Sequence, residues 1–338
     1  MLKVAINGFG RIGRAAFKAL LAKKNVEVVA INDLTDAPTL AHLLKYDSVY
    51  GIYGKKVEAV KGNLVVGGKK YQVFAEPDPK ALPWKKLGVD VVIEATGIWR
   101  DTAGAGAHLA AGAKKVIVTA PCKDEKNTIK TFVLGVNAET IKKTDKVISM
   151  ASCTTNCLAP VTEIIRQAFG IKKALMTTAH SYTADQNLVD GPHKDLRRAR
   201  SAALSIIPTT TGAAVAVTKT IPELAGNFDG MALRVPTPVG SLCDTVYLVK
   251  KQVSVQDVNK AIIKASKNAK YKGIVEVTND PIVSADIVGN PASAIVDLAL
   301  TTVIGKDLVK VVSWYDNEWG YSCRLADLAE YIYKRKLL

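Results

Sequence analysis

Residues 7–13 read Asn7-Gly8-Phe9-Gly10-Arg11-Ile12-Gly13, and this glycine loop decides the expected fold. It follows a short apolar run at residues 2–6 and opens a run with helical periodicity at residues 11–23. In a dinucleotide-binding turn of this spacing, Gly8 permits the tight turn, Gly10 lets a pyrophosphate approach the backbone, and Gly13 lets the helix pack closely on the strand. The helix N-terminus then offers free N–H groups and a positive dipole to the phosphates.

An acidic residue, Asp33, closes the second strand-like run 20 residues after Gly13. At that place a carboxylate binds the hydroxyls of the adenosine ribose, and its charge repels the 2′-phosphate of NADP. Leu34 beside it adds bulk and no cation. A glycine-rich turn with an unrelated aspartate is the alternative, but the strand–turn–helix context favours a cofactor site, and Asp33 favours NAD.

The first half of the chain alternates β-branched runs with helical patterns. Strand-like runs cover residues 2–6, 26–31, 89–95, 115–119 and 146–150, and helix-like segments cover residues 11–23, 37–46 and 102–111. Buried strands that alternate with helices predict a parallel sheet with helices on both faces. The expected fold is therefore α/β, with a Rossmann-type, doubly wound parallel sheet.

After about residue 152 the pattern changes to longer alternating runs. Those at residues 174–182, 231–236, 243–250 and 309–314 predict a mostly antiparallel, half-exposed sheet, with helices near residues 157–169 and 255–267. We expect an NAD-binding domain over residues 1–151 and an α+β catalytic domain over residues 152–317. A C-terminal helix within residues 318–338 is expected to pack back on the first domain.

The composition is that of a globular chain with a substantial core. Of 338 residues, 48% are hydrophobic and 23% charged, which excludes a disordered tail, a collagen or a coiled-coil rod. No uncharged apolar stretch reaches about 18 residues, and the strand-like run directly after Met1 leaves no room for a signal peptide. The 5 cysteines are an odd, scattered set, so we expect no disulfide framework and a cytoplasmic protein.

The formal net charge is +15, which suits nucleic acid, an anionic membrane face or small anionic substrates. The basic residues are mostly single lysines and Lys-Lys pairs spread along the chain without aromatic residues between them. We interpret most of them as a solvated surface, so nucleic acid is not predicted as a partner.

Cys153 is the candidate nucleophile. The segment from Ser152 to Cys157 follows a strand and precedes the helical residues 158–169, and Pro160 is expected in the first turn of that helix because proline lacks a backbone N–H. Cys153 would then lie at the helix N-terminus, where the dipole favours a thiolate. Of the 4 histidines, His180 ends a strand-like run and could face Cys153 as its base.

Other interpretations of these residues remain open on pattern alone. An isolated cysteine is usually a small buried hydrophobe, and an isolated histidine is usually structural. Cys153 and Cys157, four residues apart, could be a redox or metal pair, but no second Cys/His cluster has zinc spacing, so no metal site is predicted.

Candidate anion ligands follow His180. Arginine and threonine side chains around a nucleophile suit a phosphorylated substrate, although a basic run is more often a solvated or subunit-facing surface. The candidates are Thr183, Asp185, a loop at residues 190–200 with Lys194, Arg197, Arg198 and Arg200, then Thr209 to Gly212, and Arg234.

At this point the chain closely resembles phosphorylating glyceraldehyde-3-phosphate dehydrogenases over essentially its whole length. The resemblance is carried by residues 7–13 with Asn32-Asp33, 42–48, 151–157, 180–183, 208–213 and 314–318. It implies that Cys153 attacks the aldehyde, that His180 is its general base, and that NAD and inorganic phosphate turn the adduct into an acyl phosphate.

The resemblance also implies the binding residues. Thr183, Asp185 and Arg234 match the site for the substrate's own phosphate, and Ser152, Thr154, Thr211 and Gly212 match the site for the attacking phosphate, with Arg197 near both. Cofactor contacts match Arg11, Ile12, Asp33, Thr96, Gly97, Thr119 and Asn317, beside the loop glycines Gly8, Gly10 and Gly13. The loop at residues 190–200 resembles one that packs across a subunit interface, which implies a homotetramer.

Two rival functions remain. A related enzyme acting on erythrose 4-phosphate, with hydrolysis of the thioester, would use the same cysteine segment, and a phosphate requirement separates the two. A basic nucleic-acid-binding protein on the same fold is the other, and binding that falls steeply with salt would mark it.

Overall fold

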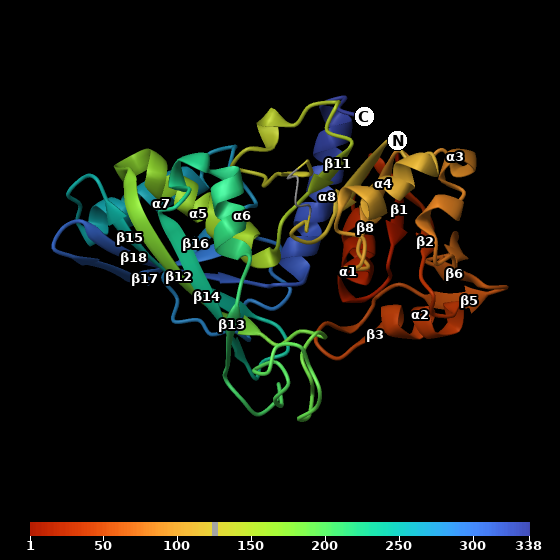
Figure 1. The fold of residues 1–338 in the computed structure, drawn as a ribbon, viewed down its shortest axis with the longest axis horizontal. Coiled ribbons are helices and arrows are strands. Elements are labelled where there is room, and N and C mark those ends of the chain that lie inside the picture. The colour runs from red at the N-terminus through yellow and green to blue at the C-terminus, as the bar shows by residue number, and fades with distance from the viewer. Residues whose placement is uncertain (124–127) are drawn as a thin grey trace. The chain divides into compact units, whose positions relative to one another are not determined.

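The computed structural model describes residues 1–123 and 128–338. The chain divides into two compact units. The first unit comprises residues 1–132, 139–151 and 322–338, and the second comprises residues 133–138 and 152–321. In Figure 1 the strands of the first unit run from red to yellow and those of the second from green to blue.

The first unit is built on a nine-stranded sheet in the order β10-β11-β9-β8-β1-β2-β7-β6-β5. All neighbours from β10 to β7 pair in parallel, and only the β7–β6 and β6–β5 pairs are antiparallel. The strands are β1 (Leu2–Asn7), β2 (Val26–Asn32), β5 (Val57–Val60), β6 (Asn63–Val66), β7 (Lys69–Phe74), β8 (Val91–Glu94), β9 (Lys115–Val118), β10 (Lys130–Thr131) and β11 (Val147–Ser149). A separate two-stranded sheet pairs β3 (Tyr46–Asp47) with β4 (Gly51–Ile52).

Both faces of the central strands are buried, as a parallel sheet requires. Ile6 is in register with Ile31 and Ile93 on one face, whereas Ala5 is in register with Ala30 and Val92 on the other. All six side chains are inaccessible to solvent. The helices of this unit are α1 (Arg11–Leu20), α2 (Ala37–Lys45), α3 (Trp84–Leu87), α4 (Thr102–Ala110) and most of α8 (Trp319–Lys334), with 3-10 turns η1 (Pro79–Ala81) and η2 (Ala138–Thr140).

The prediction of a Rossmann-type parallel sheet is confirmed. The antiparallel strands β5 to β7 were not predicted, although the turns that join them carry a signal. Gly62, Gly67 and Gly68 all have positive φ there, and paired glycines between short β-branched runs are typical of hairpins.

The second unit is built on a seven-stranded sheet in the order β13-β14-β12-β15-β18-β17-β16. The β12–β14 and β16–β17 pairs are parallel and the other four are antiparallel, so the expected mostly antiparallel sheet is confirmed. The strands are β12 (Ile171–Ser181), β13 (Ile207–Thr210), β14 (Phe228–Val235), β15 (Ser241–Val249), β16 (Val275–Thr278), β17 (Ala294–Ile304) and β18 (Leu308–Tyr315). The helices are α5 (Cys153–Phe169), α6 (Ala213–Thr220) and α7 (Val255–Ser266), with a 3-10 turn η3 (Pro222–Leu224).

One face of this sheet is covered and the other is open. Along β15 the side chains of Cys243, Thr245 and Tyr247 are buried, and those between them are half-exposed. Helix α5 packs on β15, β17 and β18 and buries most of its own length against them. This alternation is the one expected of an antiparallel sheet with a single buried face.

The expected position of Pro160 is wrong. Helix α5 begins at Cys153, so Pro160 lies inside the helix rather than in its first turn. Proline has no N–H to donate to the carbonyl of Asn156, so one helical bond is lost. Burial of most of the following residues, through Ile165, stabilises the helix despite that loss. The placement of Cys153 at the helix start is nevertheless right.

Candidate active site

A tight turn between β11 and α5 presents Cys153. Ala151 adopts a left-handed backbone with φ of 56°, which a non-glycine residue rarely does. Ser152 caps the helix by accepting from the backbone N–H of Thr155 at 3.2 Å. Cys153 is therefore the first residue of a well-capped helix.

His180 lies near the end of β12 and faces the cysteine. Its Nε2 is 3.4 Å from Cys153 Sγ, and its Nδ1 is 2.6 Å from the carbonyl oxygen of Ser181. Nη1 of Arg234 also lies 3.0 Å from Nδ1, but its two protons are donated to the Ser181 carbonyl oxygen and to Thr183 Oγ1. A carbonyl oxygen can only accept, so the proton belongs on Nδ1. This tautomer leaves the Nε2 lone pair directed at the thiol, as a general base requires.

Burial opposes charge on both partners. Burial raises the pKa of the Cys153 thiol to about 11, against the lowering effect of the Arg234 charge. Burial, reinforced by Arg234, lowers the pKa of His180 to about 3. A helix N-terminus stabilises an anion by roughly 0.3–1 kcal/mol, less than one pKa unit, so its effect on the Cys153 pKa is small beside that of burial. Both shifts have the same consequence, which is to favour a thiol and a neutral imidazole over an ion pair.

A chain of hydroxyl groups ends beside the thiol. Thr178 donates to the carbonyl oxygen of Leu242 at 3.0 Å and lies 2.9 Å from the Tyr315 hydroxyl, which lies 2.9 Å from Thr154 Oγ1. Each hydroxyl has one proton, so Tyr315 donates to Thr178, and Thr154 donates to Tyr315. The Thr154 oxygen, 4.0 Å from Cys153 Sγ, then has no proton for the sulfur. A thiolate at Cys153 therefore lacks this hydroxyl as a donor, while the thiol proton remains available to His180 Nε2.

We predict that Tyr315→Phe lowers the pKa of Cys153. Without the phenol oxygen, the Thr154 hydroxyl is free to donate to a thiolate. A hydrogen bond to a charged group is worth roughly 1.5–3 kcal/mol, so a shift of about one pKa unit or more is expected. A pKa lower by one unit raises the fraction of thiolate near neutral pH about tenfold. Each thiolate is then less nucleophilic, so the net rate of iodoacetamide alkylation should rise about threefold.

The control for this prediction is the double variant Tyr315→Phe/Thr154→Val. It lacks the hydroxyl that makes the new bond, so its alkylation rate should return toward that of the unaltered protein. A rate increase that persists in the double variant would contradict the proposed hydroxyl chain.

Arg234 on β14 lies beside the imidazole. Parallel pairing sets His180 opposite Arg234, and Nη1 of the arginine is 3.0 Å from Thr183 Oγ1 and 3.1 Å from the carbonyl oxygen of Ser181. The buried Nε of Arg234 has no partner among the described residues. An unpaired guanidinium donor next to a hydroxyl suits an oxyanion ligand.

Asp185 organises the cations around this position. It accepts from the Thr183 hydroxyl and forms an ion pair with Arg198. Partial burial raises its pKa, but the Thr183 bond and the charges of Arg234 and Arg198 more than offset this, so the pKa of Asp185 lies below its usual value. Arg198 also donates to Thr209 at 3.0 Å. Arg198, which the sequence analysis left among the loop cations, is thus tied to Thr183 and Asp185.

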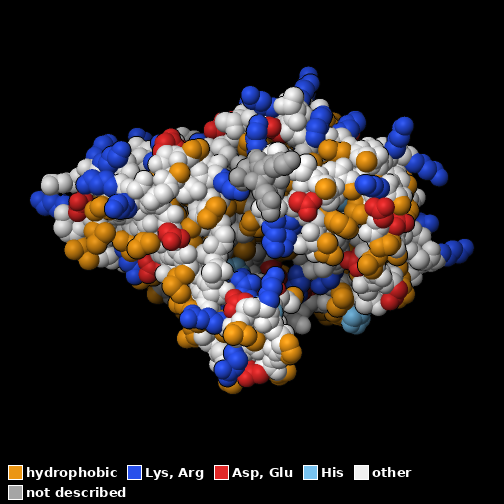
Figure 2. All heavy atoms as spheres, viewed as in Figure 1, with side chains coloured by type: hydrophobic (Ala, Val, Ile, Leu, Met, Phe, Trp, Pro, Cys, Tyr) orange, Lys and Arg blue, Asp and Glu red, His pale blue; other side chains and the backbone are white. Residues whose placement is uncertain are grey.

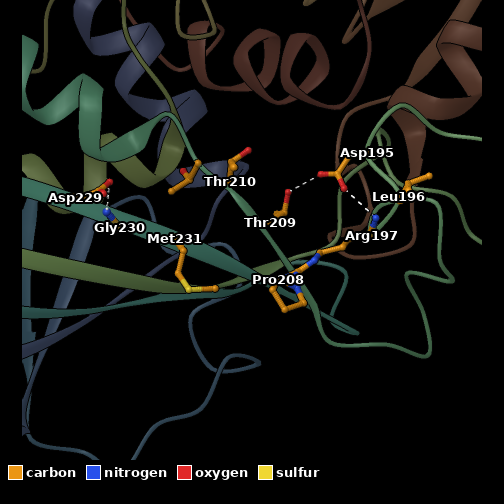
Figure 3. A pocket seen from close by; sticks show the side chains of 10 residues that line it. Asp195, Leu196, Arg197, Pro208, Thr209, Thr210, Asp229, Gly230 and Met231 are labelled. Atoms are coloured by element: carbon orange, nitrogen blue, oxygen red, sulfur yellow. Dashed lines mark hydrogen bonds between the residues drawn. The ribbon is translucent and has the colours of Figure 1, made fainter.

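Arg197 points elsewhere. It lines a cavity of about 760 Å³ that Figure 3 shows between the loop and the strands β13 and β14. Asp195 and Thr209 also line this cavity, and the Asp195 carboxylate accepts a hydrogen bond from the Thr209 hydroxyl at 3.0 Å. The other lining residues include Thr211 but not Cys153, His180 or Arg234.

The remaining anion candidates lie at two helix starts. Thr211 Oγ1 accepts from Ala213 N at 3.2 Å, and Gly212 begins α6 with no side-chain cap. A side chain at Gly212 would meet nothing within 4 Å, so the backbone at this helix start is open to a ligand. Ser152 is committed to Thr155, and Thr154 is buried against Tyr315.

The three loop glycines of the first unit have separate structural reasons. Gly8 has φ of 89°, and a Cβ there would lie 2.7 Å from the backbone of Ala95 and Thr96. A Cβ at Gly13 would lie 2.0 Å from the Gly8 oxygen, whereas one at Gly10 would meet nothing within 4 Å. The turn therefore packs tightly at Gly8 and Gly13 and stays open at Gly10, as a phosphate approaching the helix end requires.

A cavity of about 320 Å³ opens beside this loop. It includes Gly8, Gly10, Asp33 and Thr96 from the predicted cofactor contacts. The residues that line it are Asn7, Gly8, Gly10, Asn32, Asp33, Leu34, Glu76, Pro77, Ala95, Thr96, Ile98 and Trp99. Asn7, Asn32 and Glu76 were not singled out as cofactor residues by the sequence analysis; their signal was their place at or beyond the carboxyl ends of strands.

Several predicted cofactor residues have other partners. Asp33 Oδ2 accepts from the N–H of Phe9 at 2.6 Å, which fixes the glycine loop, and Arg11 forms a two-point ion pair with Asp47 at 3.1 and 3.3 Å. Arg11 and Ile12 are the first two residues of α1. Because Asp47 holds the Arg11 guanidinium, a cofactor contact here would be made by the backbone at the helix start.

The other three predicted contacts lie outside the lining of this cavity. Gly97 has φ of 72°, and the N–H of Thr119 donates to the carbonyl oxygen of Glu94 at 3.0 Å. Asn317, in the second unit, accepts from Gly240 N at 3.1 Å and Ser241 Oγ at 3.0 Å.

Within residues 1–123 and 128–338, no group of three or more His, Cys, Asp or Glu side chains is placed to hold a metal ion. Over the same residues, no helix has the length and apolar character needed to cross a membrane.

The fold defines the class, an NAD-dependent oxidoreductase, and the Cys153–His180 pair supplies a candidate nucleophile beside a candidate base. Residues 2–102 match the model of the glyceraldehyde 3-phosphate dehydrogenase NAD binding domain, and residues 152–317 match that of the C-terminal domain. The chain belongs to the glyceraldehyde-3-phosphate dehydrogenase family.

Relatives match over nearly their full length. The glyceraldehyde-3-phosphate dehydrogenase of Borreliella burgdorferi is 55% identical over 98% of this chain and 100% of its own. That of Geobacillus stearothermophilus is 54% identical over 99% of both chains. That of Thermotoga maritima is 55% identical over 99% of this chain and 100% of its own.

Proposed function

We propose that the protein oxidises glyceraldehyde 3-phosphate to 1,3-bisphosphoglycerate with NAD and inorganic phosphate, through a thioester on Cys153. The observation that carries this proposal is the 3.4 Å approach of His180 Nε2 to Cys153 Sγ, with the Arg234–Thr183 anion site beside the imidazole. Membership of the family and the NAD-binding fold of the first unit support it.

The first chemical step is attack by sulfur. His180 Nε2 takes the thiol proton as Sγ forms a bond to the aldehyde carbon, which avoids a free thiolate in a buried site. His180 then returns the proton to the oxygen of the thiohemiacetal and takes it back as that oxygen becomes a carbonyl. When bound, NAD supplies the hydride acceptor, so the adduct is oxidised to a thioester on Cys153.

The second half of the reaction releases the product. An oxygen of inorganic phosphate attacks the thioester carbon, the C–S bond breaks, and the acyl phosphate leaves with Cys153 restored. We assign the substrate's own phosphate to Thr183 and Arg234, with Asp185 orienting Thr183 and Arg198. We assign the attacking phosphate to Ser152, Thr154, Thr211 and Gly212, with Arg197 near it; the open backbone at Gly212, at the N-terminus of α6, supports this.

The NAD assignment extends to individual residues. We assign residues 1–151, with the C-terminal helix in 318–338, to NAD binding, and residues 152–317 to catalysis. The open backbone at Gly10 fits a pyrophosphate, and the Asp33 carboxylate fits ribose hydroxyls. Arg11, Ile12, Thr96, Gly97, Thr119 and Asn317 complete the proposed contacts, with the Asn317 side chain directed to the carboxamide.

The deciding experiment is NADH formation from glyceraldehyde 3-phosphate, with and without inorganic phosphate. We expect activity that requires phosphate, and we expect Cys153→Ser to abolish it while leaving NAD binding intact, because a serine hydroxyl is a far weaker nucleophile at neutral pH. Turnover by Cys153→Ser would remove the thioester mechanism. Activity without phosphate would favour hydrolysis, as in the erythrose-4-phosphate enzyme.

The two neighbouring arginines give a matched pair of variants. Arg198 is half-buried and paired with Asp185, whereas Arg197 is exposed. We predict that Arg198→Ala raises KM for glyceraldehyde 3-phosphate about tenfold or more, since a charge-assisted bond contributes roughly 1.5–3 kcal/mol. Arg197→Ala should affect that KM less and the KM for phosphate more. The reverse order would return the substrate site to Arg197.

We also propose that the protein is a cytoplasmic homotetramer. Apolar side chains remain exposed on the loop after β12, and Figure 2 shows hydrophobic side chains at the surface there and along the second sheet. Leu196 and Leu204 are 81% and 83% exposed, and Leu175 on β12 is 66% exposed. Apolar surface of this kind suits an interface between copies of the chain.

Sedimentation tests the oligomer directly. We expect a mass four times that of one chain, and we expect Leu196→Asp/Leu204→Asp to reduce it, because the added charges would be buried at the interface. Ile52→Asp, at an apolar side chain 71% exposed in the first unit, is the matched control. A single-chain mass for the unaltered protein would contradict the proposal.

A further inference from the structure

A network of hydrogen bonds between buried polar side chains lies below the turns that line the cofactor cavity. Asn7, Asn32 and Glu94 are the last residues of β1, β2 and β8, and their side chains are at most 5% exposed. These strands are adjacent in the order β8-β1-β2. Strand β2 follows β1 in the chain and lies on one side of it, whereas β8 comes later and lies on the other side, so the strand order reverses at β1. A dinucleotide crosses such a sheet at this reversal point.

The direction of each hydrogen bond is fixed from one end by a backbone. Asn32 Oδ1 accepts from Glu76 N at 2.9 Å, and Asn32 Nδ2 donates to the carbonyl oxygen of Glu76 at 2.9 Å, so this amide cannot flip. Its Nδ2 also donates to Asn7 Oδ1 at 2.7 Å. The Asn7 amide is thereby oriented with its NH₂ toward Glu94, and it donates to Oε2 at 2.6 Å.

The other end is fixed by an indole. Trp84 Nε1, which can only donate, lies 3.0 Å from His108 Nδ1. His108 Nδ1 therefore accepts, and the proton on Nε2 is donated to Glu94 Oε2 at 3.0 Å. His108 is a neutral imidazole in this tautomer.

Both oxygens of Glu94 are surrounded by donors. Besides Asn7 and His108 on Oε2, Oε1 accepts from Thr96 N at 2.8 Å and from the Thr96 hydroxyl. Three of these four groups, Asn7 Nδ2, His108 Nε2 and Thr96 N, can only donate here, and this arrangement favours the Glu94 carboxylate. Among residues 1–123 and 128–338, no lysine or arginine pairs with it. A buried anion held by neutral donors is costly to place, and its geometry is correspondingly fixed.

We propose that Glu94 is a positioning residue for NAD: its carboxylate holds the Asn7–Gly8 turn and the Thr96–Gly97 turn together, so that the cofactor cavity has its binding shape before NAD arrives. Gly8 packs closely on the backbone of Ala95 and Thr96. The Glu94 carboxylate maintains this contact by accepting hydrogen bonds from Asn7 on one side and Thr96 on the other. The inference rests on the proposed function, because it takes this cavity as the cofactor site.

The test is NAD affinity of Glu94→Gln, measured by calorimetry on the full protein. A glutamine has one acceptor oxygen, so its NH₂ must face either the Thr96 N–H or the pair Asn7 and His108, all donors. Losing a hydrogen bond of this kind predicts a rise in the Kd for NAD of at least about tenfold. KM for NAD should rise in parallel, while KM for glyceraldehyde 3-phosphate and kcat at saturating NAD change little.

The matched control is Asp90→Asn. Asp90 is a buried carboxylate just before the other end of β8, where it accepts from Lys3 N at 2.9 Å and pairs with Lys114 at 2.7 Å. It undergoes the same loss of charge far from the carboxyl ends of the strands. We expect Asp90→Asn to lower thermal stability and leave the Kd for NAD unchanged.

A second variant protects the test against misfolding. In Asn7→Asp/Glu94→Gln the charge moves one residue along the network. The oxygen of the introduced glutamine still accepts from Thr96, and its NH₂ can donate to the new carboxylate at position 7. The NH₂ of Asn32 can donate to the same carboxylate. So can His108 Nε2, which lies 3.4 Å from the Asn7 amide nitrogen that the carboxylate replaces. We expect Asn7→Asp alone to weaken NAD binding, because two carboxylates meet, and the double variant to bind NAD more tightly than either single variant.

The outcomes separate the two proposals. Weak NAD binding by the unaltered protein would overturn the proposed function itself. Normal binding by the unaltered protein and by Glu94→Gln would overturn the role of Glu94 alone. A loss of affinity as large in Asp90→Asn, or no recovery in the double variant, would also overturn it, because the effect would then be general destabilisation.

Discussion

Burial of the Cys153–His180 pair is the constraint on which the chemistry of this protein depends. A solvent-exposed pair of this kind could rest as thiolate and imidazolium, but here desolvation opposes both charges. In the proposed mechanism the proton passes from sulfur to nitrogen as the carbon–sulfur bond forms, across the 3.4 Å that separates Sγ from Nε2. The Nδ1 proton held by the Ser181 carbonyl makes this possible, because it keeps Nε2 free to accept.

The same physical device recurs at both sites. A hydroxyl has one proton and a backbone carbonyl has none, so a chain of hydrogen bonds that ends on a carbonyl has only one direction. The Leu242 carbonyl sets the direction of the chain that reaches Thr154, and the Glu76 backbone sets the direction of the one that reaches Glu94. In the first, the result is a hydroxyl that has no proton to give to a thiolate at Cys153. In the second, it is a set of donors directed at the Glu94 carboxylate.

Some of the basic residues that contribute to the high net charge have specific hydrogen-bond or ion-pair partners. Arg198 and Arg234 are placed around Thr183 and Asp185, and Arg11 is held by Asp47. Each has a specific partner, which a sequence-independent phosphate-binding surface would not need. The acidic residues thus act to orient a few cations for small anionic ligands, and the remaining lysines lie largely on the solvated surface.

The extent to which sequence predicted this arrangement follows from the range of each interaction. The glycine loop and the start of α5 are set by neighbours in the chain, so spacing and residue type were sufficient for both. Pro160 misled because helix α5 is stabilised by burial against a sheet whose strands come later in the chain. Arg197 and Arg198 are chemically alike, and only the fold of their loop decides which of them meets Asp185.

The joint role of Asn7, Asn32 and Glu94 was not predicted, for a different reason. They are distant in sequence and ordinary in type, and only the parallel register of β8, β1 and β2 makes them neighbours. Polar residues that end consecutive strands of a parallel sheet must meet at one edge. Because that edge is also where such folds bind their ligands, the last polar residue of each predicted strand should be read as a set, even before any pairing is known.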